Sequence, residues 1–216
     1  ARLGYSVSTV DYGYIKNYDW TFQGRDFSLA HSFDRSNYNA YQRAPHTIEQ
    51  YEDFIKFGTP NDPEVKAIAQ RLEDKAQAAD IQSETTKANF VLSFVQSLEY
   101  TVDNTTSGIG EFPRYPVETL VDQTGDCEDT AVLYISLLVN MGYRAALLIL
   151  PDATADSGHA AAGVAIDDFT GNQNGHYTDD DSNIDYYYGE TTAKDWVLGE
   201  MPQMDDYQAY LYPLIP

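Results

Sequence analysis

The chain is 216 residues long, which is enough for one compact domain with a sizeable core. Acidic residues outnumber basic ones 34 to 13, and the formal net charge is −21 at pH 7. Since no basic stripe offsets this charge, we expect no nucleic-acid partner. The longest apolar run, residues 145–150, is far too short to span a bilayer.

The chain begins with Ala rather than Met, so an upstream signal or anchor could have been removed. The acidic balance is consistent with a salt-rich or extracellular setting, with divalent cations, or with basic substrates. We therefore expect an extracellular or cell-envelope location, with a membrane anchor in a segment that lies outside this sequence.

Residues 1–46 predict a β-rich accessory segment, and residues 47–216 predict the main domain. The first part is rich in Tyr, Phe and Ser, and residues 20–27 indicate two short strands around Gly24. Thr47 opens a capping-box pattern that predicts a short helix as far as Ile55.

Two amphipathic helices follow. Asp62 and Pro63 are typical of a helix start, and Ser83 can cap the next helix. Their apolar positions keep helical spacing: Val65, Ile68, Ala69, Leu72 and Ala76 in the first, and Ala88, Val91, Leu92, Val95 and Leu98 in the second. Each helix should bury one face.

From Cys127 to Gly142 the pattern predicts a central helix, because almost no polar face is left along residues 131–139. Residues 143–150 and 160–166 predict two adjacent core strands, and residues 186–190 predict a third. Residues 167–185 indicate a loop rich in Gly, Asn and Asp.

The only cysteine, Cys127, falls in the first turn of the central helix, where free amides and the macrodipole favour a thiolate. Its neighbours Glu128 and Asp129 oppose that charge, so activation requires a histidine partner or a cation. The alternative is a cysteine that only packs, since free cysteines are often buried. Its acidic loop favours the functional interpretation.

His159 begins the second core strand and is the best candidate base. His31, His46 and His176 lie in predicted loops or peripheral strands, where a solvent-facing side chain is expected. Glu190 ends the third strand and could accept a hydrogen bond from the imidazole. A solvated strand-end carboxylate is the alternative for Glu190, and the reserve acids are Asp168 and Asp185.

Three features together resemble the transglutaminase-like superfamily of cysteine enzymes, which includes bacterial periplasmic proteinases and archaeal relatives. They are Gly-Asp-Cys-Glu-Asp at 125–129, the apolar helix that ends in Met-Gly-Tyr-Arg at 141–144, and a His and a Glu-Thr-Thr that accompany successive strands. The resemblance implies an α+β, papain-like core with the nucleophile at the head of a buried helix on an antiparallel sheet. It covers roughly the second half of the chain.

By the same resemblance, Cys127 attacks a carbonyl, His159 transfers the proton and Glu190 orients the histidine. The implied function is a cysteine-dependent peptidase or amidase that acts on protein or peptide substrates through an acyl-enzyme. The Cys127 amide and the Gln123 side chain would contribute to the oxyanion hole. Acyl transfer from protein glutamine is a second enzymatic alternative.

The chemistry implied by the resemblance needs no cofactor, but some bacterial relatives bind calcium beside the nucleophile. Asp126, Glu128 and Asp129 could do the same here, and residues 179–181 offer further carboxylates. Alternatively, Glu128 and Asp129 only stabilise the N-terminus of the helix through its dipole and bind no ion. A non-catalytic module that binds calcium or protein on the same fold is the remaining functional hypothesis.

Overall fold

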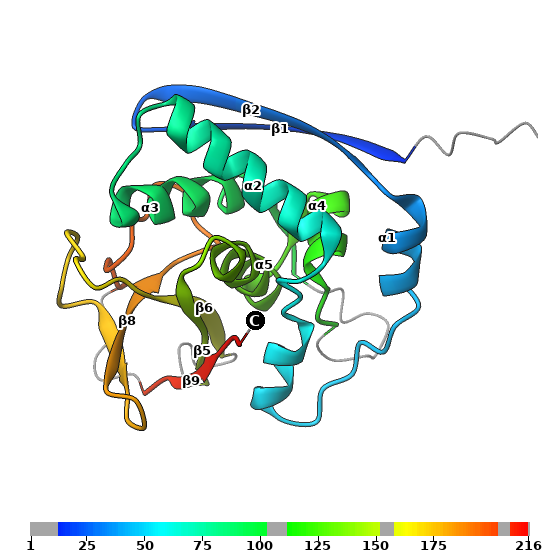
Figure 1. The fold of residues 1–216 in the computed structure, drawn as a ribbon. Coiled ribbons are helices and arrows are strands. Elements are labelled where there is room, and N and C mark those ends of the chain that lie inside the picture. The colour runs from blue at the N-terminus through cyan, green and yellow to red at the C-terminus, as the bar shows by residue number, and fades with distance from the viewer. Residues whose placement is uncertain (1–12, 103–111, 152–157, 203–207, 216) are drawn as a thin grey trace, which may run out of the picture.

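The computed structural model describes residues 13–102, 112–151, 158–202 and 208–215 (Figure 1). The helices are α1 (Arg35–Tyr41), the 3₁₀ helix η1 (Tyr51–Phe57), α2 (Pro63–Ala78), α3 (Glu84–Val95), α4 (Pro116–Asp122) and α5 (Cys127–Asn140). The strands are β1 (Tyr14–Phe22), β2 (Arg25–Phe33), β3 (Glu99–Tyr100), β4 (Thr124–Gly125), β5 (Arg144–Leu150), β6 (His159–Ala165), β7 (His176–Asp179), β8 (Ile184–Gly189) and β9 (Tyr210–Pro213). The predicted α+β class is confirmed.

The main sheet is antiparallel and has the strand order β7-β8-β6-β5-β9. Strands β5 and β6 pair along their whole length, as predicted, and their register sets Leu150 opposite His159. Both strands are almost entirely buried because their side chains are small or apolar. The sheet therefore holds His159 at the start of β6, where β5 ends.

Helix α5 occupies the middle of the molecule in Figure 1, with β5 and β6 on one side and α2 and α3 on the other. It is buried from Glu128 to Val139, which agrees with its nearly continuous apolar sequence. It ends where Gly142 adopts a φ of +90°, a conformation that suits glycine after a helix C-terminus. This packing fixes the position of the helix's first turn.

Strands β1 and β2 form a hairpin that lies over α2 and α3 in Figure 1. The two-residue loop, Gln23 and Gly24, has positive φ at both positions, as in a type I′ turn. Trp20 is buried on the inner face against Phe90 and Phe94 of α3. The predicted hairpin is therefore present, and it is longer than residues 20–27.

Several local details differ from the predictions. The segment predicted as β-rich holds the β1–β2 hairpin and also α1, whose N-cap Asp34 accepts a hydrogen bond from the amide of Ser36. The helix expected from Thr47 begins only at Tyr51, because the capping box forms between Gln50 and Asp53. The expected loop at 167–185 includes β7, which pairs with β8, and α4 and β9 had no predicted counterpart.

One apolar cluster includes hairpin residues such as Trp20 and core residues such as Leu133. The boundary at residue 46 stays a prediction. Within the described ranges, no helix combines the length and the apolar character needed to cross a membrane.

Candidate functional site

Cys127 is the first residue of α5 and is half-buried. The short parallel pairing of β3 with β4 leads the chain into this helix start. A Cβ at Gly125 would lie 2.8 Å from the Cβ of Asp129, which accounts for glycine two residues before the thiol. The sequence thus places the sulfur at the positive end of a rigid, buried helix.

His159 and Glu190 contact each other across the neighbouring strands β6 and β8. His159 Nε2 lies 3.0 Å from Glu190 Oε2, and both side chains are largely buried. The pairing of Ala162 with Gly189 sets this register. The reserve acids lie elsewhere, since Asp168 follows the opposite end of β6 and Asp185 accepts a hydrogen bond from Thr178 on β7.

The Glu190 carboxylate has partners on both oxygens. Besides His159, the Tyr188 hydroxyl donates to Oε2 at 2.8 Å, while the amide and hydroxyl of Thr192 donate to Oε1 at 2.9 and 2.6 Å. Burial raises the pKa of Glu190, but the bonds to His159 and Thr192 outweigh it and lower that pKa to about 2. Glu190 is therefore a fixed carboxylate.

The sequence alone did not predict a role for Tyr188 or Thr192. Both lie two residues from Glu190, and an extended chain places such neighbours on one face. This spacing could have indicated them. Tyr188 is fully buried, and burial raises the pKa of its hydroxyl, which stays a donor to Glu190.

Two contacts join the start of α5 to these strands. The amide of Ala160, the residue after His159, lies close enough to the Cys127 sulfur to favour the thiolate and lower the pKa of the thiol. The hydroxyls of Thr130 and Thr191 lie 2.8 Å apart in a buried hydrogen bond. The structure thus brings Cys127 and the His159–Glu190 pair into one region.

The electrostatics around Cys127 oppose a thiolate, as the acidic motif indicated. Burial raises the pKa of the Cys127 thiol well above its ordinary value, and the charges of Glu128 and Asp126 raise it further. The Sγ–H group donates to Glu128 Oε2 at 3.3 Å. Tyr100 on β3 is near enough that burial, followed by the charges at Cys127 and Asp126, raises its pKa to about 12.

Asp126, Glu128 and Asp129 form a buried cluster, with one possible ligand atom from each lying within 4.8 Å of the others. Burial, followed by repulsion from Asp126 and Asp129, raises the pKa of Glu128 to about 10. Arg114 donates to Asp129 from its amide at 2.6 Å and from its guanidinium at 2.9 Å. Glu128 Oε1 is buried and has no hydrogen-bond partner among the described residues.

These three carboxylates could hold a hard divalent cation, because such ions take several oxygen ligands. The orphaned oxygen of Glu128 fits that role. In the part of the chain that the structure describes, the carboxylates at 179–181 do not form a comparable group of three.

Gln123 lies at the end of α4 in the left-handed conformation, with φ of 60°. Its side-chain amide donates to the backbone oxygen of Asn17 on β1 at 2.8 Å. Its contribution to an oxyanion hole stays a prediction. The structure gives this side chain a different partner, at the edge of the hairpin.

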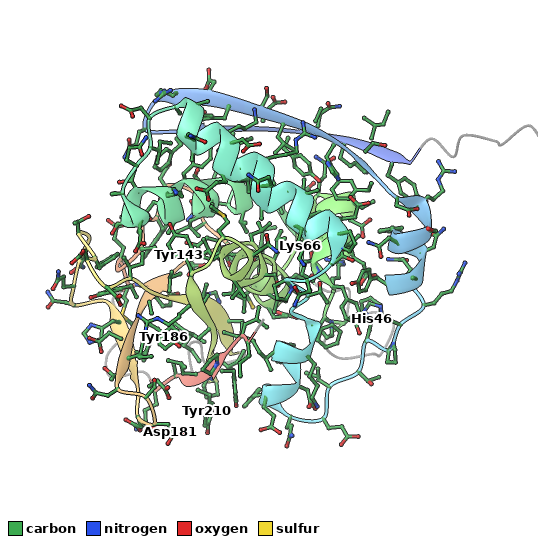
Figure 2. The ribbon with its side chains drawn as sticks, in the orientation of Figure 1. His46, Lys66, Tyr143, Asp181, Tyr186 and Tyr210 are labelled. Carbon is green, nitrogen blue, oxygen red and sulfur yellow. The ribbon has the colours of Figure 1, made fainter. Side chains whose placement is uncertain are left out.

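The other histidines have partners outside the Cys127 region. His46, labelled in Figure 2, is buried rather than solvent-facing, which corrects the prediction. Its ring nitrogens lie 2.8 Å from the Pro113 oxygen and 3.1 Å from the Tyr41 oxygen. His31 contacts Glu64 at 2.6 Å, and His176 contacts the Gln173 oxygen at 2.8 Å.

Comparison with solved structures finds distant similarities. Legionella pneumophila LapG is 18% identical, with a TM-score of 0.45, and the match covers 78% of this chain and 89% of LapG. A calcium-bound structure of the same protein is 17% identical, with a TM-score of 0.41 and coverage of 67% and 86%. A TGase structure is 14% identical, with a TM-score of 0.44 and coverage of 88% of this chain and 46% of that one.

A comparison with curated proteins finds no match. A comparison with protein families finds one described as a transglutaminase-like domain, which matches residues 64–172. This range is half of the chain and contains both Cys127 and His159. The chain therefore belongs to the transglutaminase-like domain family.

Proposed function

We propose that this chain is a cysteine-dependent peptidase or amidase that acts on protein or peptide substrates. Cys127 is the nucleophile, His159 the base and Glu190 the acid that orients the histidine. The 3.0 Å contact between His159 and Glu190, next to the Ala160 amide that favours the Cys127 thiolate, carries this proposal. We also propose that the protein works outside the cytoplasm.

The reaction begins when His159 takes the thiol proton and the sulfur attacks the substrate carbonyl carbon. The Glu190 bond occupies Nε2, so this proton moves to Nδ1. A C–S bond forms, and the carbonyl oxygen becomes an oxyanion that the Cys127 amide stabilises. The C–N bond then breaks, and the leaving amine takes the proton from the imidazolium.

The second half of the reaction removes the acyl group. His159 takes a proton from water, the resulting hydroxide attacks the thioester, and the C–S bond breaks. The products are a carboxylic acid and the regenerated thiol. An amine in place of water would give acyl transfer, which is the enzymatic alternative to hydrolysis.

The test is turnover of fluorescein-labelled casein by the wild type and by Cys127→Ala. We expect loss of turnover in the variant, with an unchanged circular dichroism spectrum as evidence of folding. Adding a primary amine separates hydrolysis from acyl transfer, since only transfer incorporates the amine into the casein. Full turnover by Cys127→Ala would contradict the proposal.

The acidic cluster supports a second proposal, that Asp126, Glu128 and Asp129 bind calcium. The buried oxygen of Glu128 that lacks a hydrogen-bond partner favours it, because burial and the neighbouring acids destabilise the charged carboxylate that a calcium ion would stabilise. A bound calcium would neutralise the carboxylates that surround the thiol. Isothermal titration with calcium tests it, and a wild type that releases no heat of binding would contradict it.

A further inference from the structure

Strand β1 has an edge that the hairpin leaves unpaired. The two-residue turn makes Phe22 and Arg25 the pair that exchanges hydrogen bonds, and the ladder then alternates along the strand. Even-numbered residues of β1 therefore bond to β2, while odd-numbered residues direct their N–H and C=O groups outward. The bond from the Gln123 amide to the Asn17 oxygen agrees with this assignment.

A cavity of about 390 Å³ lies along this edge. Its wall combines β1, the polar side of α3 and the segment that follows Glu190, through residues that include Asp19, Thr21, Ser93, Gln96, Trp196 and Val197. Over the residues that the structure describes, the outward backbone groups of Asp19 and Thr21 make no hydrogen bond. An open row of donors and acceptors thus borders the cavity.

The cavity adjoins the candidate active site. The side-chain amide of Gln96 donates to the backbone oxygens of Glu190 at 2.7 Å and Trp196 at 3.0 Å. At the other end of the edge, Asn17 accepts a hydrogen bond from Gln123. Gln123 lies two residues before Gly125, in the segment that leads into α5. A chain that pairs with Thr21 and Asp19 is therefore directed toward Asn17 and the loop that leads into α5.

An extended peptide is the ligand whose chemistry fits this edge. Outward N–H and C=O groups that repeat every two residues match the backbone of an added β-strand. Side chains of such a strand would alternate between the outer face, beside exposed Asp19, and the inner face, beside Trp20 and Trp196. The acid favours basic side chains on one face, and the aromatic wall favours apolar ones on the other.

We propose that the outer edge of β1 and the adjoining cavity bind an extended segment of the substrate as an added β-strand. The segment carries basic side chains on one face and apolar side chains on the other. That the bound peptide is a substrate rests on the proposed function, whereas the binding itself does not.

The probe is a fluorescein-labelled heptapeptide of alternating Lys and Val, titrated by anisotropy into the Cys127→Ala protein. We expect saturable binding. Methylation of a peptide backbone nitrogen should weaken this binding about tenfold at every second residue, where the N–H bonds to β1, but not at the residues between them. Amide exchange supplies the second readout. Saturation with peptide should slow exchange at Asp19 and Thr21, whereas Trp20 already bonds to β2 and should change little.

Thr21→Pro removes one outward donor from the cavity edge, and Ile15→Pro makes the same change outside the cavity. Proline is tolerated on an edge strand where its nitrogen faces solvent, so both hairpins should stay folded. Only Thr21→Pro should weaken peptide binding, again by about tenfold. Equal effects of the two prolines, or unchanged exchange at Asp19 and Thr21, would overturn the proposal.

Casein turnover by the wild type separates this proposal from the proposed function. Peptide binding with the exchange pattern above but without turnover would refute the peptidase and keep the binding edge. Turnover without that pattern would refute the binding edge and keep the peptidase.

Discussion

Protonation of Glu190 should lower the free energy of unfolding in acid. Glu190→Gln should abolish this contribution to the pH dependence. The pKa of Glu190 falls from its ordinary 4.5 to about 2 in the folded protein. At about 1.36 kcal/mol for each pKa unit, this difference corresponds to about 3 kcal/mol of free energy of unfolding. Because the folded-state pKa is the lower one, this stability is present above 4.5 and is lost as the pH falls toward 2.

The assay is urea unfolding of the wild type and Glu190→Gln at a series of pH values from about 6 to about 2. Other carboxylates titrate equally in both proteins, so the difference between the two unfolding free energies isolates Glu190. We expect that difference to shrink by about 3 kcal/mol across the series. A difference that stays constant would refute the assignment of Glu190 as a carboxylate held by its four donors.

Three further perturbations follow from the same contacts. Tyr188→Phe removes one donor to Glu190 and should lower kcat about tenfold with little change in KM, measured on labelled casein; an unchanged kcat would exclude a positioning role. Calcium should raise the melting temperature of the wild type but not of Glu128→Gln, measured by calorimetry, and an equal rise in both would place calcium elsewhere. Leu133→Ala, in the fully buried part of α5, should cost about 2–5 kcal/mol in urea unfolding, and a cost near zero would contradict the central packing of this helix.

The sequence predicted the core of the fold well where one local pattern dominated. The apolar run from Ala131 to Val139 could only be a buried helix, and the two strands that follow it had no polar face. Asp62 and Ser83 cap α2 and α3 as expected, since such caps act within three residues. These features depend on neighbours in sequence, which a single chain displays.

Features that depend on distant partners were not predictable in the same way. His46 was expected at the surface, yet it is buried by contact with Phe112 and with the Pro113 oxygen, more than sixty residues along the chain. Arg114 binds Asp129 through a similar long-range contact. The start of η1 was misplaced because Thr47 and Gln50 both head a plausible capping box, and local sequence does not rank them.

For the candidate site, the sequence proposed three residues that the structure brings into one region, but it did not predict the contacts that hold them. Cys127, His159 and Glu190 followed from their positions at a helix start and at strand ends. Tyr188 and Thr192 drew no attention because a tyrosine and a threonine are ordinary strand residues. Their spacing of two residues from Glu190 was the available signal, and the hydrogen bonds of the structure show that both serve this carboxylate.

The most direct test of an activated Cys127 is the rate at which iodoacetamide alkylates the native thiol in millimolar calcium, followed by mass spectrometry across pH. The chain has one cysteine, so the label reports only this thiol. His159→Ala is the test variant, and His176→Ala, on the edge strand β7, is the matched control. We expect rapid labelling below neutral pH in the wild type and in His176→Ala, and its loss in His159→Ala. Equal rates in all three proteins would contradict a thiol activated by His159.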